Sequence, residues 1–341
     1  MAEITWPRIK QYFKSQLLTK LPTPTKSFAG QTVIVTGSNT GMGLEAARHL
    51  VRLNAARVVL AVRSTAKGEA AAASIRSSFP DRPSEDLDSV VQVWPLDLAS
   101  YESVKAFAAR AADELERLDV VINNAGMYVY KSGFALAEGD EATITVNVVC
   151  TLLLGLLLLP KLRETSMKYD KECVLTFTGS FVHFMTDFPE RRNENIFKAL
   201  ADEKTARMPD RYNVSKLMEL LLVRELAGQI TKSSGPGRVT TSIINPGFVR
   251  TDIMRDASWL FHIYYVCLAA LMARTSEEGG RILVNAAEGG EETHGQYLDD
   301  CKVGTSSAFV RSQEGQKVGQ QLWSELAAKL EVIHPGVMKN V

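Results

Sequence analysis

The residues best suited to acid–base chemistry are Tyr212 and Lys216, which stand four positions apart in Tyr212-Asn-Val-Ser-Lys216. On a helix this spacing places both side chains on one face, one turn apart. A free tyrosine has a pKa of about 10 and is a poor proton donor or acceptor at neutral pH. Because a neighbouring ammonium stabilises the phenolate and lowers its pKa, the pair predicts a catalytic couple that opens a helix.

The spacing alone does not identify this couple, because Tyr101-Glu-Ser-Val-Lys105 repeats it. The second copy directly follows the third predicted strand and starts a helix on the flank of the predicted sheet. We therefore interpret Tyr101 and Lys105 as a coincidental match without a catalytic role.

A glycine-rich turn predicts a binding site for a pyrophosphate group. Residues 36–43 read Thr-Gly-Ser-Asn-Thr-Gly-Met-Gly and join the first predicted strand to the first predicted helix. Glycine lets the backbone turn tightly and approach the ligand, and the helix N-terminus presents unpaired N–H groups to the anion. The residues expected to hold a dinucleotide at this turn are Gly37, Asn39, Thr40, Gly41, Met42 and Gly43.

The residue that ends the second predicted strand favours one dinucleotide over the other. In dinucleotide-binding folds an acidic residue at this place binds the ribose 2′-hydroxyl of NAD, whereas an arginine accommodates the 2′-phosphate of NADP. The strand ends in Leu60-Ala-Val-Arg63, twenty residues after Gly43 and with no acid nearby. Arg63 therefore predicts NADP(H) as the cofactor.

Two further turns are expected to line the cofactor, because ligands of open α/β sheets bind at the carboxyl ends of the strands. Asp97 and Leu98 follow the third strand, placed to reach the adenine ring, and the polar turn 123–126 follows the fourth. The predicted contacts in the second of these turns are Asn124, Ala125 and Gly126.

Apolar β-branched runs alternate with helical patterns from residue 31 onward. Strands are expected at Thr32–Thr36, Arg57–Val62, Val90–Trp94, Leu118–Ile122, Cys173–Phe177 and Val239–Ile244. Helices are expected at Gly41–Asn54, Thr65–Phe79, Ser100–Leu115, a long stretch ending at Pro160, and Tyr212–Ile230, while Pro80–Asp88 is expected to be a surface loop. This pattern predicts an α/β fold, with a single doubly wound (Rossmann-type) parallel sheet and helices on both faces, in one domain over residues 31–341.

Residues 1–30 form an amphipathic extension ahead of that domain. The apolar residues of one helical stripe are Trp6, Ile9, Phe13, Leu17 and Leu21. Basic residues lie among them, and two prolines end the pattern. One interpretation is a helix that packs on its own domain or on a partner subunit. The other is a basic amphipathic helix within residues 1–25 that rests on a membrane surface.

Composition excludes several classes of function. Lys plus Arg and Asp plus Glu both number 39, so charge gives no reason to expect nucleic acid as a partner. The four cysteines are far apart and form no CxxC, which predicts buried thiols in a reducing compartment and no metal site. No secretory pattern opens the sequence, so a cytoplasmic protein is expected, or one peripheral on an intracellular membrane.

Two apolar runs are long enough to be compared with a membrane-spanning helix. Val148–Leu159 and Leu260–Ala273 are both shorter than the roughly 20 residues that span a bilayer, so buried helices are expected. The first run is either core or the interface of a homodimer.

Together these motifs resemble those of the short-chain dehydrogenase/reductase family. The matching residues, in the family's order, are Thr36-Gly-x3-Gly41-x-Gly43, Asn123-Asn124-Ala125-Gly126, Asn147, Ser180, Tyr212-x3-Lys216 and Asn245-Pro246-Gly247. They span nearly all of residues 31–251. More narrowly, Ser38–Gly41, Ala61–Arg63 and Gly295–Lys302 are similar to the retinol-dehydrogenase-like branch, and within it to fungal reductases of polyketide or terpenoid metabolites.

The resemblance implies a role for each matching residue. Tyr212 passes a proton to or from the substrate oxygen while hydride moves at the nicotinamide, and Lys216 binds the ribose and lowers the tyrosine pKa. Ser180 holds the substrate carbonyl, and Asn147 supports a water that relays protons from Lys216. The residues implied at the nicotinamide end are Pro246, Gly247, Val249 and Thr251.

Two segments depart from the family pattern. The insert 181–211 separates Ser180 from Tyr212. It is expected to fold over the substrate mouth or to form a surface excursion. Because this link is long, Thr178 competes with Ser180 for the role of the residue that holds the substrate carbonyl. His183 could reach the pocket, but a loop histidine without a role is the simpler interpretation. Residues 254–273, within a substrate lid at about 248–275, are strongly apolar and form either a wall for a bulky lipophilic substrate or a core or interface helix.

The leading hypothesis is an NADP(H)-dependent enzyme that interconverts a ketone and a secondary alcohol on a bulky lipophilic substrate, expected to be a polyketide or terpenoid metabolite. The alternatives are a retinol- or steroid-type dehydrogenase, a non-redox catalyst with NADP as a structural cofactor, and a cofactor-binding protein that has lost chemistry. The intact set of Tyr212, Lys216, Ser180 and Asn147 argues against the last. Sequence alone does not exclude the non-redox catalyst.

Overall fold

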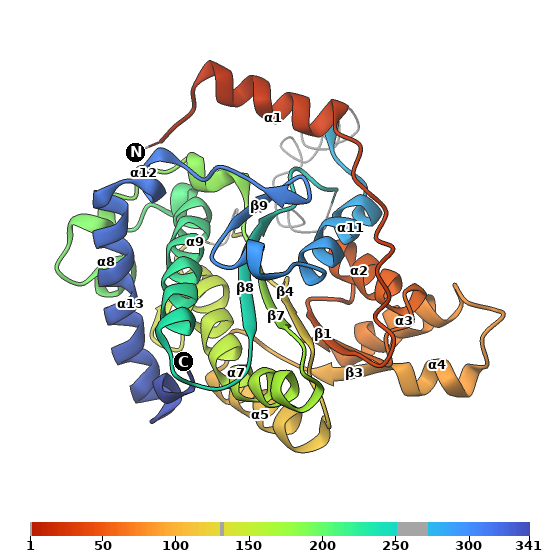
Figure 1. Ribbon diagram of the computed structural model, residues 1–341. Coiled ribbons are helices and arrows are strands. Elements are labelled where there is room, and N and C mark those ends of the chain that lie inside the picture. The colour runs from red at the N-terminus through yellow and green to blue at the C-terminus, as the bar shows by residue number, and fades with distance from the viewer. Residues whose placement is uncertain (1, 130–132, 251–271) are drawn as a thin grey trace.

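The computed structural model of the protein describes residues 2–129, 133–250 and 272–341, with a large sheet at its centre (Figure 1). The eight strands of this sheet lie in the order β10-β9-β8-β7-β4-β1-β2-β3. They are β1 (Thr32–Thr36), β2 (Arg57–Val62), β3 (Val91–Pro95), β4 (Val120–Asn123), β7 (Cys173–Thr178), β8 (Val239–Asn245), β9 (Tyr297–Asp299) and β10 (Lys302–Val303). Within this described sheet all neighbours are parallel except β10, which runs antiparallel to β9.

Helices cover both faces of the sheet (Figure 1). One layer contains α2 (Gly41–Arg52), α3 (Thr65–Arg76) and α11 (Ser276–Ala287). The other contains α5 (Tyr101–Glu114), α7 (Thr151–Tyr169) and α9 (Met208–Lys232), with α13 (Gln313–Ile333) packed outside α9. Each layer shares a buried apolar cluster with one face of the sheet. The doubly wound parallel sheet predicted from the sequence is confirmed.

The chain crosses from one half of the sheet to the other between β3 and β4. Because β1 lies beside both β2 and β4, the turns after β1 and β4 meet at the point where the strand order reverses. Ligands of doubly wound sheets bind at this switch point. The glycine turn and the turn 123–126 therefore lie where the sequence predicted a cofactor.

The predicted loop Pro80–Asp88 is wrong in its second half, where α4 (Ser84–Val90) forms. Glu85 and Asp86 stand in its first turn, where negative charge is favourable, and Leu87 and Val90 are buried. The strands β9 and β10 were also missed, since both are too short to show a strand pattern.

The expected end of a helix at Pro160 is wrong, because α7 continues through the proline to Tyr169. A proline inside a helix has no N–H to offer the carbonyl four residues earlier. Here that carbonyl belongs to Leu156, and the side-chain amide of Asn340 donates to it at 3.0 Å. A residue from the last helical turn of the described chain, η6 (Val337–Asn340), thus replaces the missing bond.

The continuous helix Ala142–Tyr169 is, by length and composition, long and apolar enough to cross a membrane. This helix is longer than the apolar run Val148–Leu159 because it starts before Val148 and continues past Pro160. However, 83% of its most apolar window is buried inside the protein. The run Val148–Leu159 is accordingly part of the core rather than a dimer interface.

The helix that carries the tyrosine and lysine starts earlier than predicted. α9 begins at Met208, with Pro209 in its first turn, so Tyr212 lies in the second turn and does not open the helix. A proline at this place is compatible with a helix start because the first N–H groups have no intrahelical partner. The four-residue spacing still puts Tyr212 and Lys216 on one face.

Candidate active site

The glycine turn after β1 is closely packed on the turn after β4. Gly37 has φ +64°, and a Cβ there would lie 2.9 Å from the Cα of Ala125. A Cβ on Gly43 would lie 2.6 Å from the Gly37 carbonyl oxygen and 2.6 Å from the Asn124 side-chain nitrogen. Both positions therefore require glycine, one for its backbone angle and both for space.

The N-terminus of α2 directly follows the glycine turn. The helix starts at Gly41, after the exposed N-cap residue Thr40. Unpaired N–H groups at a helix N-terminus attract phosphate. The turn and helix thus fit the pyrophosphate of a dinucleotide, with Asn39 and Met42 on either side of Thr40 and Gly41.

Thr36, which was not among the predicted site residues, fixes the second turn. Its hydroxyl accepts hydrogen bonds from the N–H groups of Asn124 and Ala125, each at 2.9 Å. The side chain of Asn124 donates to the Thr36 carbonyl at 2.9 Å and to that of Gly37 at 3.3 Å. The two predicted cofactor turns are therefore one hydrogen-bonded unit.

The residues expected near the adenosine half lie at the ends of β2 and β3. Arg63 directly follows β2 and is exposed, and no hydrogen bond or ion pair within the described ranges holds its guanidinium. Asp97 is half-buried and accepts the N–H of Ala99 at 2.9 Å, while Leu98 is buried. Arg63 is thus available to an anionic ligand beside the glycine turn.

Tyr212, Ser180 and Lys216 meet beyond the carboxyl end of β7. The Ser180 hydroxyl accepts the N–H of Val182 at 3.3 Å, and its interaction with Tyr212 lowers the pKa of that tyrosine. The Lys216 Nζ lies 5.8 Å from the centre of the Tyr212 ring. Lys216 also borders the cofactor turn, because a Cβ on Gly126 would lie 3.7 Å from its Nζ. The three residues and the cofactor turns therefore form one site.

Thr178, the competitor of Ser180, contacts Lys216 through its backbone. The backbone carbonyl of Thr178 accepts a hydrogen bond from the Lys216 Nζ at 2.7 Å, and its hydroxyl is buried among the described residues without a partner. Of these two described residues, Ser180 is the one whose side chain lowers the pKa of Tyr212. The geometry favours Ser180.

A carboxylate that the sequence prediction missed lies against the lysine. Glu219, one turn further along α9, accepts a hydrogen bond from Lys216 at 2.7 Å, and the two side chains are 2% and 4% exposed. Burial raises the pKa of Glu219 to about 7, against the attraction of the ammonium. Burial alone would lower the pKa of Lys216, but the charges of Glu219 and Tyr212 outweigh it and raise that pKa. Its i+3 spacing from Lys216 was the only sequence signal.

The pKa of Tyr212 differs from the expectation. Desolvation raises it, the Lys216 ammonium lowers it, Glu219 raises it and the Ser180 hydrogen bond lowers it, with a raised pKa as the net result. Lys216 lowers the pKa of Tyr212, as predicted. Burial and the charge of Glu219 raise this pKa by more. At neutral pH Tyr212 therefore holds its proton.

Asn147 lies beside these residues in a π-helical turn, Thr145–Cys150, that precedes α7. Its side chain accepts the N–H of Met127 at 2.8 Å and donates to the Met127 carbonyl and to the Ser215 hydroxyl, both at 3.0 Å. These bonds use both N–H donors of the side-chain amide, so the side chain positions the segment after Gly126. The role implied for Asn147, the support of a water that relays protons from Lys216, stays a prediction.

The predicted nicotinamide end follows β8. Gly247 donates its N–H to Asn245, Pro246 offers its carbonyl to Arg274, and Val249 is buried and bridges to Arg274. Thr251 and the apolar segment 254–273 lie outside the described residues, apart from the last two positions of that segment. The described part of the turn comes near the start of α2, because a Cβ on Gly279 would lie 2.5 Å from Met42 and 3.1 Å from Val249.

The insert 181–211 folds against the protein instead of leaving it. It forms η2 (Phe181–Phe184), η3 (Pro189–Arg192) and α8 (Ile196–Leu200), and its Phe184 and Phe188 are 2% and 1% exposed. Buried Arg211, just before Tyr212, lies 3.5 Å from Glu141 and 3.8 Å from Glu190. These charges tie the insert to the start of α9. The plain surface excursion is therefore wrong.

His183 has a structural role. It is 2% exposed, donates from Nδ1 to the Ser180 carbonyl at 2.7 Å and accepts the N–H of Ser307 on Nε2 at 3.3 Å. Burial lowers its pKa to about 4, so it is neutral at pH 7. It orients the Ser180 backbone.

Tyr128 is a further residue that the sequence prediction missed. Its ring meets that of Tyr212 edge to face, with centroids 4.9 Å apart. It follows the turn 123–126 by two positions, which is the signal that could have pointed to it.

The coincidental pair, Tyr101 and Lys105, lies on α5. Lys105 forms an ion pair with Glu102, and the Tyr101 hydroxyl contacts the Glu138 carbonyl.

Comparisons with known proteins agree with this geometry. Residues 31–181 match the family described as short chain dehydrogenase. The chain is 42% identical to the short chain dehydrogenase/reductase dmxR8 of the fungus Cryptosporiopsis sp. (strain 8999), over 96% of this chain and 99% of that protein.

Solved structures share the fold. One is a short chain dehydrogenase from Shigella flexneri 2a complexed with NADP, with TM-score 0.54, 22% identity and coverage of 81% of this chain and 99% of that one. Another is a 3-ketoacyl-(acyl-carrier-protein) reductase from Brucella melitensis complexed with NADH, with TM-score 0.56, 18% identity and coverage of 80% and 97%.

Fold and site together define an oxidoreductase that binds a nicotinamide cofactor. The chain belongs to the short-chain dehydrogenase/reductase family. The resemblance inferred from its motifs is confirmed, whereas the narrower similarity to the retinol-dehydrogenase-like branch stays a prediction.

Proposed function

We propose that the protein is an NADP(H)-dependent reductase that converts a ketone to a secondary alcohol on a bulky lipophilic substrate, a polyketide or terpenoid metabolite. The observation that carries the proposal is the gathering of Tyr212, Ser180 and the buried Lys216 beside the cofactor turns. A proton donor, a carbonyl-binding hydroxyl and a cationic side chain at a dinucleotide site suit carbonyl reduction.

The proposed mechanism assigns one task to each residue. Ser180 donates a hydrogen bond to the substrate carbonyl oxygen, and Tyr212 transfers its proton to the same oxygen. A bound nicotinamide supplies the hydride to the carbonyl carbon. The Lys216 ammonium stabilises the phenolate that remains on Tyr212. Because the Tyr212 pKa is raised, the residue holds its proton at neutral pH and is able to donate it in the reduction.

The proposed cofactor residues fit NADP(H) in two ways. The glycine turn and the N-terminus of α2 suit the pyrophosphate, and Arg63 lies exposed at the end of β2, where a 2′-phosphate is recognised. Structural relatives hold NADP in one case and NADH in another, so the choice rests on Arg63.

A spectrophotometric assay tests the proposal. The purified protein should consume NADPH, followed by its absorbance, with members of a panel of lipophilic ketones, and each product should carry one new hydroxyl group. Conversion of a substrate without loss of NADPH would favour non-redox chemistry. The absence of any turnover while NADPH binds would favour the cofactor-binding protein.

Arg63→Asp is expected to raise the Kd for NADPH by about 10- to 100-fold, since it replaces a charge-assisted contact with repulsion. The Kd for NADH should change much less, because NADH lacks the 2′-phosphate. Arg57→Asp, at the opposite end of β2, is the matched control and should leave both affinities unchanged. Equal losses for the two cofactors in Arg63→Asp would contradict the assignment.

A further inference from the structure

Helix α1 (Trp6–Leu18) turns its apolar side away from the protein. Trp6, Phe13 and Leu17 fall within about 40° of arc on the helix, and they are 75%, 43% and 54% exposed. Leu18, which follows Leu17 in the chain, is 77% exposed. A surface helix ordinarily buries its apolar stripe against the protein. This helix does pack on its own chain, as one interpretation of the sequence expected. Of the predicted stripe, Leu21 is buried and Ile9 half-buried, whereas Trp6, Phe13 and Leu17 face outward.

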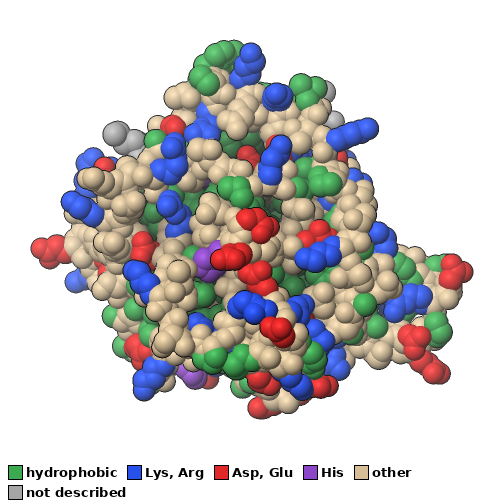
Figure 2. All heavy atoms as spheres, viewed as in Figure 1, with side chains coloured by type: hydrophobic (Ala, Val, Ile, Leu, Met, Phe, Trp, Pro, Cys, Tyr) green, Lys and Arg blue, Asp and Glu red, His purple; other side chains and the backbone are tan. Residues whose placement is uncertain are grey.

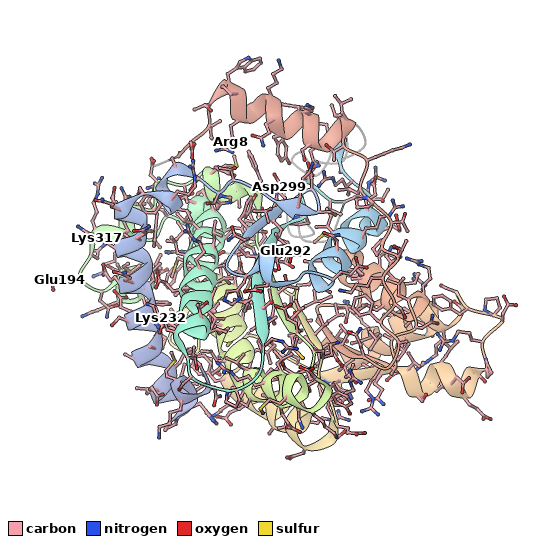
Figure 3. All side chains as sticks on the ribbon, viewed as in Figure 1. Arg8, Glu194, Lys232, Glu292, Asp299 and Lys317 are labelled. Atoms are coloured by element: carbon pink, nitrogen blue, oxygen red, sulfur yellow. The ribbon has the colours of Figure 1, made fainter. Side chains whose placement is uncertain are left out.

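Polar and aromatic residues of the opposite side hold α1 in place. Gln16, the buried residue of the helix, accepts the N–H of Phe248 at 2.7 Å. The Ser15 hydroxyl donates to Asp300 at 2.8 Å, and the Tyr12 ring lies 4.4 Å from that of Phe181. Arg8, also on this side, points from α1 toward the rest of the protein (Figure 3). These contacts fix which side of α1 faces outward.

A cavity of about 360 Å³ lies under α1, between the helix and the ends of β8 and β9. Its lining includes Tyr12, Phe181, Asn245 and Asp299, but neither Tyr212 nor Lys216. The inner side of α1 thus faces a cavity lined by both polar and aromatic residues. The apolar stripe remains on the outside of the molecule.

The charge around the stripe has one sign. No Asp or Glu occurs between Glu3 and Glu45, whereas Lys10, Lys14 and Lys20 are exposed. Hydrophobic and basic side chains gather along the edge of the molecule over α1 (Figure 2). A helix with aromatic and aliphatic residues flanked by lysines is suited to the interface of a membrane with anionic lipids.

We propose that the outer face of α1, formed by Trp6, Lys10, Phe13, Lys14, Leu17 and Leu18, docks on an anionic lipid surface such as the cytoplasmic leaflet of an intracellular membrane. The apolar side chains enter the headgroup region and the lysines contact the lipid charges. A second copy of the chain fits less well. In a two-fold dimer through this face, lysines would oppose lysines with no acid of the segment between them.

The docking surface lies close to the active site. Gln16 binds the N–H of Phe248, next to Gly247, one of the residues implied at the nicotinamide end. If the proposed function holds, a lipophilic substrate dissolved in the membrane reaches the site from the same side. The docking itself is independent of that function, so its failure and the failure of the redox proposal are separate results.

Vesicle sedimentation with the full chain tests the proposal. The wild type should bind phosphatidylcholine vesicles that contain phosphatidylserine, bind pure phosphatidylcholine far more weakly, and lose affinity as salt rises. Trp6→Ser/Phe13→Ser/Leu17→Ser should lower the affinity about 100-fold or more. Lys10→Glu/Lys14→Glu should lower it about 25-fold or more. Trp6 fluorescence should shift to shorter wavelength on binding, a change absent in Trp6→Phe.

Matched controls separate this face from general surface charge and hydrophobicity. Lys232→Glu/Lys317→Glu makes the same charge change away from α1 (Figure 3), and Val332→Ser removes an apolar side chain that is 83% exposed. Both should bind vesicles like the wild type. Absence of wild-type binding overturns the proposal, and so does an equal loss in the control charge variant. A dimer in light scattering that the triple variant abolishes, without vesicle binding, would assign the face to a second copy.

Discussion

Tyr212→Phe is expected to lower kcat for ketone reduction by about 10²–10⁴-fold, the usual contribution of a positioned proton donor. The substitution removes only the hydroxyl. The ring keeps its edge-to-face contact with Tyr128, and Lys216 keeps its bonds to Thr178 and Glu219. The Kd for NADPH, measured by fluorescence titration, should therefore stay close to that of the wild type while single-turnover loss of NADPH absorbance slows.

The chain supplies its own control for this prediction. Tyr101→Phe makes the same chemical change at a tyrosine with the same spacing to a lysine, on the flank of the sheet. Its rate of NADPH consumption should equal that of the wild type. A wild-type rate of NADPH consumption in Tyr212→Phe would remove Tyr212 from the mechanism. Equal losses of rate in the two variants would indicate a general effect on folding.

The parts of the fold and site that could be predicted depend on neighbouring residues in the sequence. The apolar strands, the glycine turn and the tyrosine–lysine spacing all report local geometry, and each strand predicted from residues 32–245 exists within two residues of its expected bounds. Parallel pairing then places the strand ends together, so the meeting of Tyr212 with the cofactor turns follows from topology.

The parts that could not be predicted depend on distant contacts. Pro160 reads as a helix end unless Asn340 is known to bond the Leu156 carbonyl. The stripe of α1 reads as a buried face unless Gln16 is known to bind Phe248. Glu219 reads as an ordinary charged helix residue, since nothing in the sequence shows that both it and Lys216 are buried. In each case a tertiary contact reverses the local preference.

Glu219→Leu is expected to lower the free energy of unfolding by about 3–5 kcal/mol, because it leaves the buried Lys216 ammonium without the carboxyl oxygen that accepts its hydrogen bond. Lys216 would keep only the bond to the Thr178 carbonyl, and burial would then lower its pKa. Denaturant unfolding measures the loss. Glu225→Leu, two turns further from the site on the same helix, is the control and should cost far less, since Glu225 is only half-buried.

Glu219→Gln separates charge from packing, since glutamine has the same shape and its amide oxygen still accepts a bond from Lys216. Burial raises the pKa of Glu219 from 4.5 to about 7. The folded protein thus keeps this proton at pH values where the unfolded chain has released it, and the stability contributed by Glu219 falls as the pH rises from 4.5 to about 7. The unfolding free energy of the wild type minus that of Glu219→Gln should fall over the same interval. A difference that rises with pH would mean that the carboxyl pKa is lowered and the pair is a stabilising ion pair.

The same variant tests Glu219 as a positioning residue for the acid–base couple. Because the charge of Glu219 raises the pKa of Tyr212 and that of Lys216 lowers it, removing the carboxylate should lower the Tyr212 pKa. Alcohol oxidation needs the phenolate, so its kcat/KM should begin to rise at lower pH in Glu219→Gln than in the wild type. Ketone reduction needs the protonated tyrosine, so its kcat/KM should begin to fall at lower pH. A residue with only a structural role would change the height of these profiles but not their position, and unshifted profiles would restrict Glu219 to holding Lys216 in the core.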